Sequence, residues 1–403
     1  MSEDRGPLEG VTVVDISSSY AAPTTSMYLG DMGATVLKIE PLRGDDARGW
    51  GPPFLNGEAA WFLSVNRNKK SLCLDIRPTE GLQVLFRLLE SADVLIENLN
   101  PAKLEKHGLE LSGLRERFPQ LVICALSGFG LDGPDAALPG YDLIAQARSG
   151  LMSVTGVDGV PQRVSTALSD VAAGTVAAFA VASALVRQRT TGRGEIVDVA
   201  LLEADLAFMA PRIASFLAGD NEPRPSGGSD SVIAVYQSFD TADRPIVVAC
   251  GNDRLWKRAC QALGLDDLAD DPTLDTNAQR RERRPEVVGA FADVLAVMTS
   301  DSALETLTAA GVPCGRINFL SEVVTDPQIV ARKAIVDQQH PIAGVFRGVA
   351  APWRLGSDDS REPRLRAPLI GEHGEEILKT AGYDAAAVQQ LVERGVVWLP
   401  PSK

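Results

Sequence analysis

Apolar residues in the first third of the chain form two kinds of pattern, one typical of helices and one typical of strands. Apolar residues recur with helical spacing at 22–30 and 81–90. Strands and helices that alternate at these lengths predict a parallel sheet with helices on its faces, and such sheets bind ligands outside the carboxyl ends of their strands. Short segments rich in apolar residues predict strands at positions 11–16, 35–40, 72–75, 94–96 and 121–126, and the first of these has the composition of a buried strand.

The rest of the chain continues this alternation and then changes character. A long Ala- and Gly-rich helix from 171 ends at the segment TTGRG, and the segment 219–231, GDNEPRPSGGSDS, has the composition of a linker. The remaining pattern predicts a strand at 195–199, a helix at 201–217, a hairpin at 232–249, helices to about 332, strands within 334–355 and a mostly helical end at 371–393. We therefore expect a large domain that begins with residues 1–218, a small domain with its linkers at 219–331, and a C-terminal segment at 332–403.

Length and composition limit the class of protein. A chain of 403 residues is too long for one ordinary core, so two domains are expected. Hydrophobic residues make up 45% and charged residues 23%, as in soluble globular proteins. The net charge of −14 argues against nucleic acid as a partner, because that partner requires a basic face. The apolar stretch 171–186 is shorter than a membrane span requires, so no membrane partner is expected.

Cysteine and histidine positions exclude several kinds of site. Five scattered cysteines without a CxxC pair, and a polar start without a targeting segment, favour reduced thiols and a cytoplasmic protein. The three histidines, His107, His340 and His373, are dispersed, so neither a metal site nor a Ser/His triad is expected. The turn after the first strand, SSSYAAP at 17–23, lacks the glycines of a dinucleotide-binding loop, which argues against a nicotinamide dehydrogenase.

One carboxylate has a position that suggests chemistry. Asp170 ends the segment TALSD and directly precedes the long apolar helix. An unperturbed aspartate has a pKa of about 3.9 and is ionised at neutral pH, and the N–H groups of a helix N-terminus favour the anion further. If a substrate carbonyl can reach it, this carboxylate is a nucleophile. The alternative is that Asp170 is only an N-cap.

Several segments together give the chain a resemblance to the family III CoA-transferases, the group that also contains formyl-CoA transferases, carnitine CoA-transferases and α-methylacyl-CoA racemases. They extend over nearly the whole chain, in the family's order. The matching segments are PLEGV at 7–11, DMGATVLKIE at 31–40, NRNKKS at 66–71, ADVLIEN at 92–98, PGYD at 139–142 with QA at 146–147, TGRG at 191–194, GVPCG at 311–315 and APLIGEH at 367–373.

The resemblance implies an architecture that periodicity alone does not. It implies an α/β fold in which the C-terminal segment 332–403 returns to complete a Rossmann-like large domain. The middle block then forms a smaller α+β domain. Two chains are expected to interlock as a homodimer, which buries far more surface than a standard interface.

The resemblance also places Asp170 on the family's catalytic aspartate, in a matching Ala-Leu-Ser-Asp context. It implies that CoA moves from an acyl-CoA to a small carboxylic acid through an aspartyl anhydride and an aspartyl-CoA thioester. The acyl-CoA thioester is then a substrate, and neither a metal nor a permanently bound cofactor is expected. The identities of the acyl donor and of the acceptor acid stay open.

Further site residues follow from the same resemblance. Because Pro41 stands beside the position where formyl-CoA transferases have an arginine, Arg43 would reach the phosphates from a shifted position. Ordinary surface charge is the alternative role for Arg77 and Lys106. The expected set for CoA and substrate is Ser19, Leu74, Asn98 and Leu99 along the nucleotide and pantetheine arm, Arg43, Arg77 and Lys106 at the phosphates, Tyr20, Gly140 and Tyr141 near the substrate, and Gly227 and Gly228 as a glycine loop over the site.

Two other functions remain as alternatives. The family's racemases move an α-proton between a histidine and an aspartate, but the position of that histidine holds Tyr141. A phenol with a pKa of about 10 is a poor substitute for an imidazole in two-base chemistry. The remote alternative is a CoA-binding protein without catalysis, which the presence of Asp170 and of the full middle block disfavours.

Overall fold

The computed structural model describes residues 6–355 and 361–401, and the chain forms two compact units. The large unit consists of Met1–Gly150, Val164–Ala210 and Pro327–Lys403, and the second unit of Leu151–Arg163 and Pro211–Asp326. The expectation that no targeting segment is present rests on the start of the chain, of which residues 1–5 lie outside the described part.

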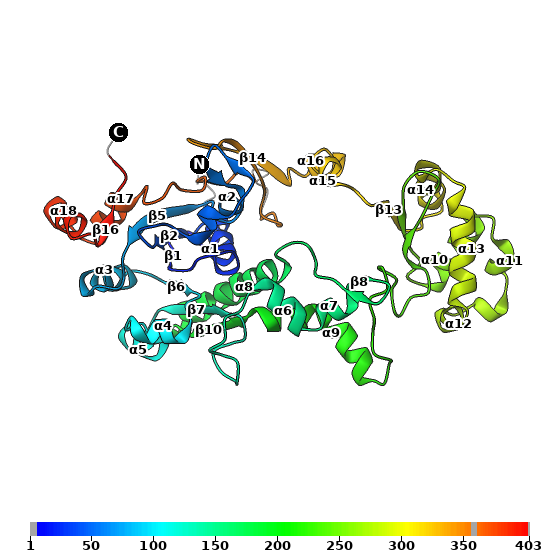
Figure 1. The fold of residues 1–403 in the computed structure, drawn as a ribbon, viewed down its shortest axis with the longest axis horizontal. Coiled ribbons are helices and arrows are strands. Elements are labelled where there is room, and N and C mark those ends of the chain that lie inside the picture. The colour runs from blue at the N-terminus through cyan, green and yellow to red at the C-terminus, as the bar shows by residue number, and fades with distance from the viewer. Residues whose placement is uncertain (1–5, 356–360, 402–403) are drawn as a thin grey trace. The chain divides into compact units, whose positions relative to one another are not determined.

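A mostly parallel sheet organises the large unit (Figure 1). Its strands are β1 (Thr12–Asp15), β2 (Thr35–Glu40), β5 (Lys69–Leu74), β6 (Val94–Glu97), β7 (Val122–Ser127), β10 (Ile196–Ala200) and β16 (Val397–Trp398). Among the described residues the order of these seven strands is β10-β7-β6-β1-β2-β5-β16, and only the pairing of β16 with β5 is antiparallel. The predicted parallel sheet is confirmed, and the C-terminal segment contributes its last strand.

Helices cover both faces of this sheet. Consecutive strand residues point to opposite faces, so neighbouring residues of β1 belong to different hydrophobic clusters. Val13 belongs to a hydrophobic cluster that includes α1 (Ala21–Asp31) and α8 (Leu168–Thr191). Its neighbour Val14 belongs to a second cluster, with α3 (Thr79–Leu89), α17 (Gly374–Thr380) and α18 (Ala385–Glu393). The large unit also holds η1 (Asp46–Gly49), β3 (Phe54–Leu55), β4 (Glu58–Ala59), α2 (Ala60–Val65), α4 (Pro101–Lys106), α5 (Leu111–Arg117), α6 (Asp142–Arg148), the first part of α9 (Leu201–Leu217), α16 (Pro327–Ala331), β14 (Ile335–His340) and β15 (Gly344–Val349).

The close contact between α1 and α8 positions the site described below. A Cβ atom added at Gly174 of α8 would lie 2.6 Å from the carbonyl oxygen of Ala21 and 2.8 Å from Cβ of Thr24. The hydroxyl of Thr25 donates a hydrogen bond to the carbonyl oxygen of Gly174, at 3.2 Å. The missing side chain therefore lets the second turn of α8 approach the first turn of α1 closely.

The second unit is a smaller α+β assembly. A three-stranded antiparallel sheet, β11-β12-β13, packs its Phe239 and Ile246 with helical residues such as Trp256 and Phe291 in one hydrophobic cluster. Its elements are α7 (Leu151–Val154), β8 (Gly156–Val157), β9 (Val160–Pro161), the end of α9, β11 (Tyr236–Phe239), β12 (Ile246–Ala249), α10 (Asp253–Ala262), α11 (Asp266–Ala269), η2 (Pro272–Leu274), α12 (Asn277–Glu282), α13 (Arg284–Ala296), α14 (Ser300–Ala309), β13 (Cys314–Arg316) and α15 (Leu320–Val323).

The division of the chain differs in detail from the expected one. Along the sequence, the boundaries between the units fall at 210/211 and 326/327, and the predicted boundaries were 218/219 and 331/332. In addition, the segment Leu151–Arg163 belongs to the second unit. That segment is held by hydrogen bonds that the sequence does not announce. The amide of Gly159 donates to the carbonyl of Pro225, and the amide of Gly227 donates to the carbonyl of Gly156.

Helix α8 is long and apolar enough, by length and composition, to cross a membrane, within the part of the chain that the structure describes. Half of its most apolar window is buried inside the structure, where it packs on α1 and the sheet. A core helix passes the same test of length and composition, so this helix is weak support for a membrane span.

Candidate active site

The loop after β1 is held at nearly every backbone polar group. The side-chain amide of Asn98 donates to the carbonyl of Ser18 at 2.8 Å, and its oxygen accepts from the amide of Ser18 at 3.1 Å. The amide of Ser19, which has a left-handed φ of 75°, donates to Asp45 at 3.1 Å. Asp45 in turn forms an ion pair with the buried Lys38 at 2.8 Å. Because Asn98 follows β6, the clamp fixes the loop across two neighbouring strand ends.

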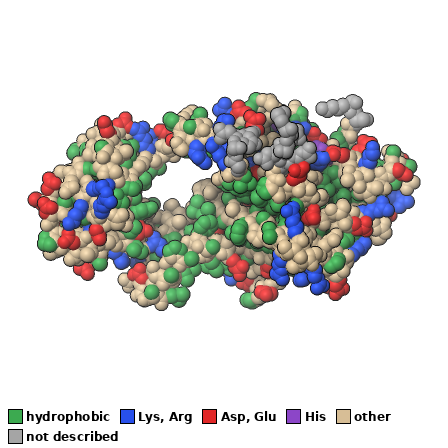
Figure 2. Space-filling view, turned by 180° about the vertical axis from the view of Figure 1, so that it is seen from behind, with side chains coloured by type: hydrophobic (Ala, Val, Ile, Leu, Met, Phe, Trp, Pro, Cys, Tyr) green, Lys and Arg blue, Asp and Glu red, His purple; other side chains and the backbone are tan. Residues whose placement is uncertain are grey.

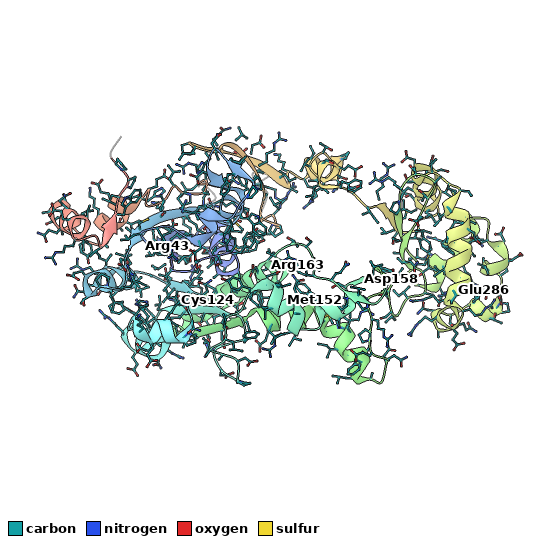
Figure 3. All side chains as sticks on the ribbon, viewed as in Figure 1. Arg43, Cys124, Met152, Asp158, Arg163 and Glu286 are labelled. Carbon is teal, nitrogen blue, oxygen red and sulfur yellow. The ribbon has the colours of Figure 1, made fainter. Side chains whose placement is uncertain are left out.

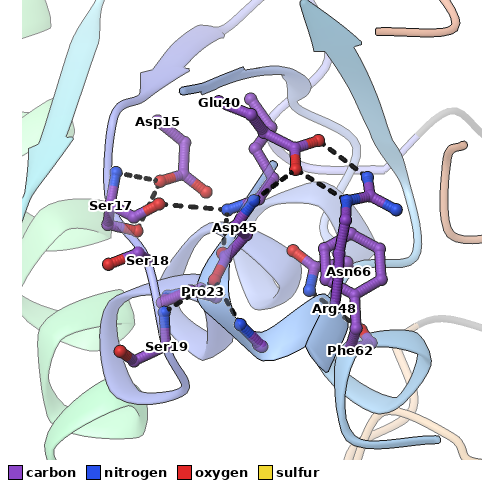
Figure 4. A network of polar contacts seen from close by, with 12 residues as sticks. Asp15, Ser17, Ser18, Ser19, Pro23, Glu40, Asp45, Arg48, Phe62 and Asn66 are labelled. Carbon is purple, nitrogen blue, oxygen red and sulfur yellow. Dashed lines mark hydrogen bonds and ion pairs between the residues drawn. The ribbon is translucent and has the colours of Figure 1, made fainter. Parts of the chain in front are cut away.

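A buried network of charges supports this loop from below (Figure 4). Asp15 ends β1 and accepts hydrogen bonds from the amide and hydroxyl of Ser17, and its carboxylate lies 3.3 Å from Nζ of Lys69. Burial alone would raise the pKa of Asp15, but Lys69 and Lys38 hold it below its ordinary value. Glu40 at the end of β2 binds Arg48 through both oxygens, each at 2.7 Å. The carboxyl ends of these two strands are therefore connected to their surroundings by hydrogen bonds and ion pairs.

Asp170 lies in the first turn of α8, because the helix begins at Leu168 rather than at 171. The interpretation of Asp170 as an N-cap is therefore wrong, since the capping position holds Ala167, whose side chain cannot accept a hydrogen bond. Asp142, the first residue of α6, supplies the missing acceptor. Its Oδ1 accepts from the amide of Ser169 at 2.8 Å, which ties the start of α6 to the start of α8.

The environment of Asp170 works against its negative charge. Burial, as the largest cause, and the neighbouring carboxyl groups of Asp142 and Asp205 together raise the pKa of Asp170 to about 7. The expectation of an ordinary ionised aspartate is therefore corrected. The N–H groups at the start of a helix favour an anion by only about 0.3–1 kcal/mol, which desolvation and two carboxyl groups exceed here.

Tyr20, at the entry to α1, lies within electrostatic reach of Asp170. Burial raises the pKa of Tyr20, and the charge of Asp170 contributes to that rise, so the two side chains are within electrostatic reach of each other. The hydroxyl of Ser64 donates to the carbonyl of Trp61, so Tyr20 donates its own proton to Ser64, at 3.0 Å. The ring of Trp61 packs edge-on against Tyr20 with centroids 5.2 Å apart.

Gly140 and Tyr141 approach the sheet through a backbone crossing. A Cβ atom on Gly140 would lie 2.3 Å from Cα of Gly128, and one on Gly128 would lie 2.5 Å from Cα of Gly140. Only two glycines permit this crossing, which brings Asp142 to the start of α8. Tyr141 is 65% exposed, so its phenol is open to solvent in this chain.

The three residues expected to bind phosphate are exposed, and the two arginines among them form ion pairs with aspartates. Arg43 follows β2 (Figure 3) and forms an ion pair with Asp46 at 3.0 Å, with 76% of its side chain exposed. Arg77 binds the two oxygens of Asp75 at 2.8 Å and 2.7 Å. Lys106 is the exposed last residue of α4. Exposed ion pairs of this kind contribute little to stability, so a phosphate can replace the carboxylate at low cost.

The remaining expected residues fall in different settings. Leu74 buries its side chain in a core cluster at the end of β5. Leu99 is half-buried and donates its amide to Glu97 at 2.7 Å. Gly227 and Gly228 lie in the second unit with left-handed φ values of 67° and 92° and open space around their Cα atoms. In residues 6–355 and 361–401, no group of three His, Cys, Asp or Glu side chains is arranged to hold a metal ion.

Sequence reasoning missed three residues around Asp170. Ser169 connects two carboxyl groups, because its hydroxyl lies 2.8 Å from Oδ2 of Asp205 and its amide donates to Asp142. Asp142 was quoted only as part of the PGYD motif, and Asp205 was not considered. A signal for Asp205 existed, since it is a single acid on the otherwise apolar face of α9 that includes Leu201 and Met209.

The loop after β1 stands at the carboxyl edge of an open α/β sheet, which is the edge where proteins of this class bind their ligands. Comparison with known proteins gives the family. The model of CoA-transferase family III matches residues 8–374. The succinyl-CoA:glutarate CoA-transferase of Mus musculus is 36% identical over 97% of this chain and 90% of that protein. The chain therefore belongs to CoA-transferase family III and is an enzyme of that type.

Other relatives and solved structures agree. The succinate–glutarate CoA-transferase of Agrobacterium fabrum is 35% identical over 94% of this chain and 96% of that protein. The acetyl-CoA:oxalate CoA-transferase of Acetobacter aceti is 32% identical over 94% and 96%. A crystal structure of a CaiB/BaiF family protein from Brucella suis superposes with a TM-score of 0.81 at 35% identity, covering 94% of this chain and all of that one.

Proposed function

We propose that this enzyme moves CoA from an acyl-CoA to a small carboxylic acid, with Asp170 as the nucleophile. The observation that carries the proposal is the setting of Asp170. It lies in the first turn of α8, half-buried, beside Tyr20 and the fixed loop after β1. This loop stands at the edge of the sheet where α/β proteins bind ligands. A carboxylate held there is positioned for attack on a thioester carbonyl.

The transfer proceeds by four exchanges of acyl groups. The Asp170 carboxylate attacks the thioester carbonyl, the C–S bond breaks, and CoA thiolate leaves an aspartyl mixed anhydride. The thiolate attacks the aspartyl carbonyl, which releases the donor acid and forms an aspartyl-CoA thioester. The acceptor carboxylate attacks this thioester to give a second anhydride and free thiolate. The thiolate then attacks the acceptor's carbonyl, which yields the product acyl-CoA and regenerates Asp170.

Positioning supplies much of the rate, because a carboxylate is a weak nucleophile in water. Well-oriented intramolecular reactions reach effective molarities of about 10⁵–10⁸ M. Two connections in the structure support such positioning. The amide of Ser169 is anchored to Asp142, and Gly174 holds α8 against the start of α1.

The CoA moiety is proposed to lie along the carboxyl ends of β1, β2, β5 and β6. Ser19 and Asn98 stand at two of these ends in a fixed arrangement. Arg43, Arg77 and Lys106 supply exposed positive charge near the others, and phosphates would replace the present carboxylate partners of the two arginines. Gly227 and Gly228 belong to the second unit, and their role as a glycine loop stays an expectation from the family resemblance.

The substrate class follows from the relatives. Their names give succinyl-CoA with glutarate, and acetyl-CoA with oxalate, as donor and acceptor. Both acceptors are small dicarboxylic acids. We therefore propose a small dicarboxylic acid as the acceptor here, and succinyl-CoA as the donor with which to begin.

The proposed assembly is an interlocked homodimer in the cytoplasm. Helix α8 supports it, because its exposed stripe carries Val176, Phe179 and Val186, which are 44%, 75% and 66% exposed. Figure 2 shows hydrophobic side chains reaching the surface among the charged groups. Contiguous exposed apolar surface is typical of an interface.

The test is mass spectrometry of the intact protein after incubation with succinyl-CoA. We expect an adduct that hydroxylamine removes, located on the tryptic peptide 164–187, which contains Asp170. The Asp170→Asn variant should show neither the adduct nor transfer to glutarate, and the exposed Asp132→Asn variant should behave as wild type. Transfer by Asp170→Asn at the wild-type rate would contradict the proposal. Deuterium entering the α-carbon of a branched acyl-CoA without any adduct would show a racemase instead.

A further inference from the structure

A second buried carboxyl group lies beside the first turn of α8. Asp205 of α9 is fully buried, and its Oδ2 lies 2.8 Å from the hydroxyl of Ser169, the residue before Asp170. The hydroxyl of Ser149 is 3.5 Å from the same oxygen. Within the described residues, Oδ1 of Asp205 has no hydrogen-bond partner.

The charges around Asp205 are all negative. Asp142 faces it from the start of α6, and Asp170 lies in the first turn of α8. The cation of α6, Arg148, is paired with Asp135 at 2.6 Å. No Lys or Arg in the described part of the chain forms an ion pair with Asp205. An ionised carboxylate in this place would be buried beside two other acids without compensation, which is strongly unfavourable.

Asp15 shows how this protein treats a buried carboxylate that is charged. Asp15 is also fully buried, but it has Lys69 at 3.3 Å and accepts hydrogen bonds from Ser17 and Ser26. Both of its oxygens therefore meet donors. Asp205 has no cation and one oxygen without a donor, so the two buried acids are built for opposite charge states.

The hydrogen bonds available to the Ser169 hydroxyl also indicate that Asp205 is neutral. It has one proton and two oxygen neighbours, Oδ2 of Asp205 at 2.8 Å and the carbonyl oxygen of Asp142 at 3.3 Å. If Asp205 were a carboxylate, both neighbours would be acceptors and one contact would remain unbonded. If Asp205 is a carboxylic acid, it donates to Ser169, and Ser169 donates to Asp142. Both contacts are then hydrogen bonds.

We propose that Asp205 is a positioning residue for the transfer reaction, a neutral carboxylic acid that donates its proton to Ser169 and so holds the helix turn of Asp170. It also keeps a second negative charge away from the nucleophile. The proposal rests on the proposed role of Asp170 and adds the residue that orients it. Asp170 can then ionise to react while Asp205 remains protonated.

The test compares Asp205→Asn, Asp205→Ala and Ser169→Ala, using succinyl-CoA and glutarate across pH 5 to about 9. The amide of Asp205→Asn can donate to Ser169 as the acid does, so it should rescue kcat to within about threefold of wild type. The other two variants leave the turn unsupported and should lose about 10- to 100-fold in kcat with a smaller change in KM. Glu203→Gln, exposed on the same helix, is the matched control and should behave as wild type.

The pH profile separates a positioning role from a purely structural one. If Asp205 is neutral, Asp205→Asn leaves the acid limb of kcat/KM in place and removes any fall at high pH that comes from ionisation of Asp205. If Asp205 is charged, Asp205→Asn removes a negative neighbour of Asp170, and the acid limb moves to lower pH. That shift, or folded Asp205→Asn as inactive as Asp205→Ala, would overturn the proposal.

A measurement without substrate keeps this test independent of the proposed function. The infrared measurement is made on unliganded protein at pH 7 with Asp170→Asn as the background, because Asp170 itself is partly protonated at this pH. The difference spectrum caused by adding Asp205→Asn should show the loss of a protonated carboxyl band, and the one caused by adding Asp142→Asn should not. If Asp205→Asn removes no such band, the neutral state of Asp205 is overturned. If wild type transfers no CoA to any acid, the proposed function fails while the infrared result still decides the state of Asp205.

Discussion

The Asp170 carboxyl group is placed where its charge is disfavoured and its reactivity is raised. With a pKa of about 7, about half of it is ionised at neutral pH in the unliganded protein. A carboxylate with a higher pKa is a better base, and one that has lost part of its water shell attacks a carbonyl more readily. If Asp170 is the proposed nucleophile, fewer molecules carry the carboxylate at neutral pH, but each carboxylate is more reactive.

The raised pKa of Asp170 makes the free energy of unfolding depend on pH. The pKa of Asp170 is 3.8 in an unperturbed chain and about 7 in the folded protein. Below about pH 4 both states are protonated, and above it the unfolded chain ionises first, so Asp170 makes folding less favourable as pH rises to about 7. Asp170→Asn should therefore be more stable than wild type by about 2–4 kcal/mol at pH 8 and by clearly less at pH 5.

Urea unfolding at both pH values, at one protein concentration, measures this difference. Asp132→Asn, at an exposed position, is the control and should shift stability by less than about 0.5 kcal/mol at either pH. An equal effect of Asp170→Asn at pH 5 and pH 8 would show that the Asp170 charge is not disfavoured in the folded protein.

The residues of the site were predictable in part. Asp170, Ser19 and Asn98 could be found because they lie in motifs or directly after strands, where the chain itself positions them. The raised pKa of Asp170 could not be predicted, since it comes from burial and from Asp142 and Asp205, which are 28 and 35 positions away in sequence and are brought near by helix packing. Local patterns describe a side chain's own element, and they carry no record of its neighbours on other elements.

At the scale of elements, the contact of α1 with α8 connects the loop after β1 to the helix that carries Asp170. Gly174→Ala adds a methyl group that would lie 2.6 Å from the carbonyl oxygen of Ala21, so the helices must separate. We expect a loss of about 1–3 kcal/mol in stability, as for other overpacked sites. Because Tyr20 precedes α1 and Asp170 begins α8, kcat should fall at least tenfold, with a smaller change in KM for succinyl-CoA.

Ser183→Ala is the matched control for this variant. It lies on the exposed side of the same helix, where its hydroxyl donates only to the carbonyl of Phe179, so stability and kcat should stay near wild type. If Gly174→Ala unfolds at the wild-type urea concentration and transfers CoA at the wild-type rate, the close contact of α1 and α8 is not needed for the site.

The elements themselves followed from the sequence where burial was strong. Parallel strands such as β7, at Val122–Ser127, are buried on both faces and so appear as apolar runs. The last strand, β16, was missed because Val397–Trp398 is two residues long and is defined by its pairing with β5, more than 300 residues away. The start of α8 was placed too late because its N-terminus is stabilised by Asp142 rather than by a capping residue of its own.

At the scale of the whole molecule, the net charge has the same sign as the proposed substrate. The chain carries a charge of −14, yet its proposed substrate is a polyanion. Binding must therefore depend on local positive charge such as Arg43 and Arg77 rather than on the overall field.

The boundary of the second unit shows a limit of what the sequence can predict. Residues 151–163 join that unit through backbone hydrogen bonds to the linker, which no composition change reveals.

The exposed stripe of α8 predicts how the molecule assembles. From Val171 to Val186 the helix has no charged residue, so its solvent side is apolar or carries small hydroxyls over more than four turns. A monomer would expose this stripe, and an interlocked dimer would cover it. We expect sedimentation velocity to show a dimer that does not dissociate on dilution to nanomolar concentration. Phe179→Glu should give monomers or aggregates, because it buries a charge in that interface. Val297→Glu, at an 81% exposed position after α13, should leave the dimer intact. A stable, soluble and active Phe179→Glu monomer would show that each chain holds a complete site and that the stripe is not an interface.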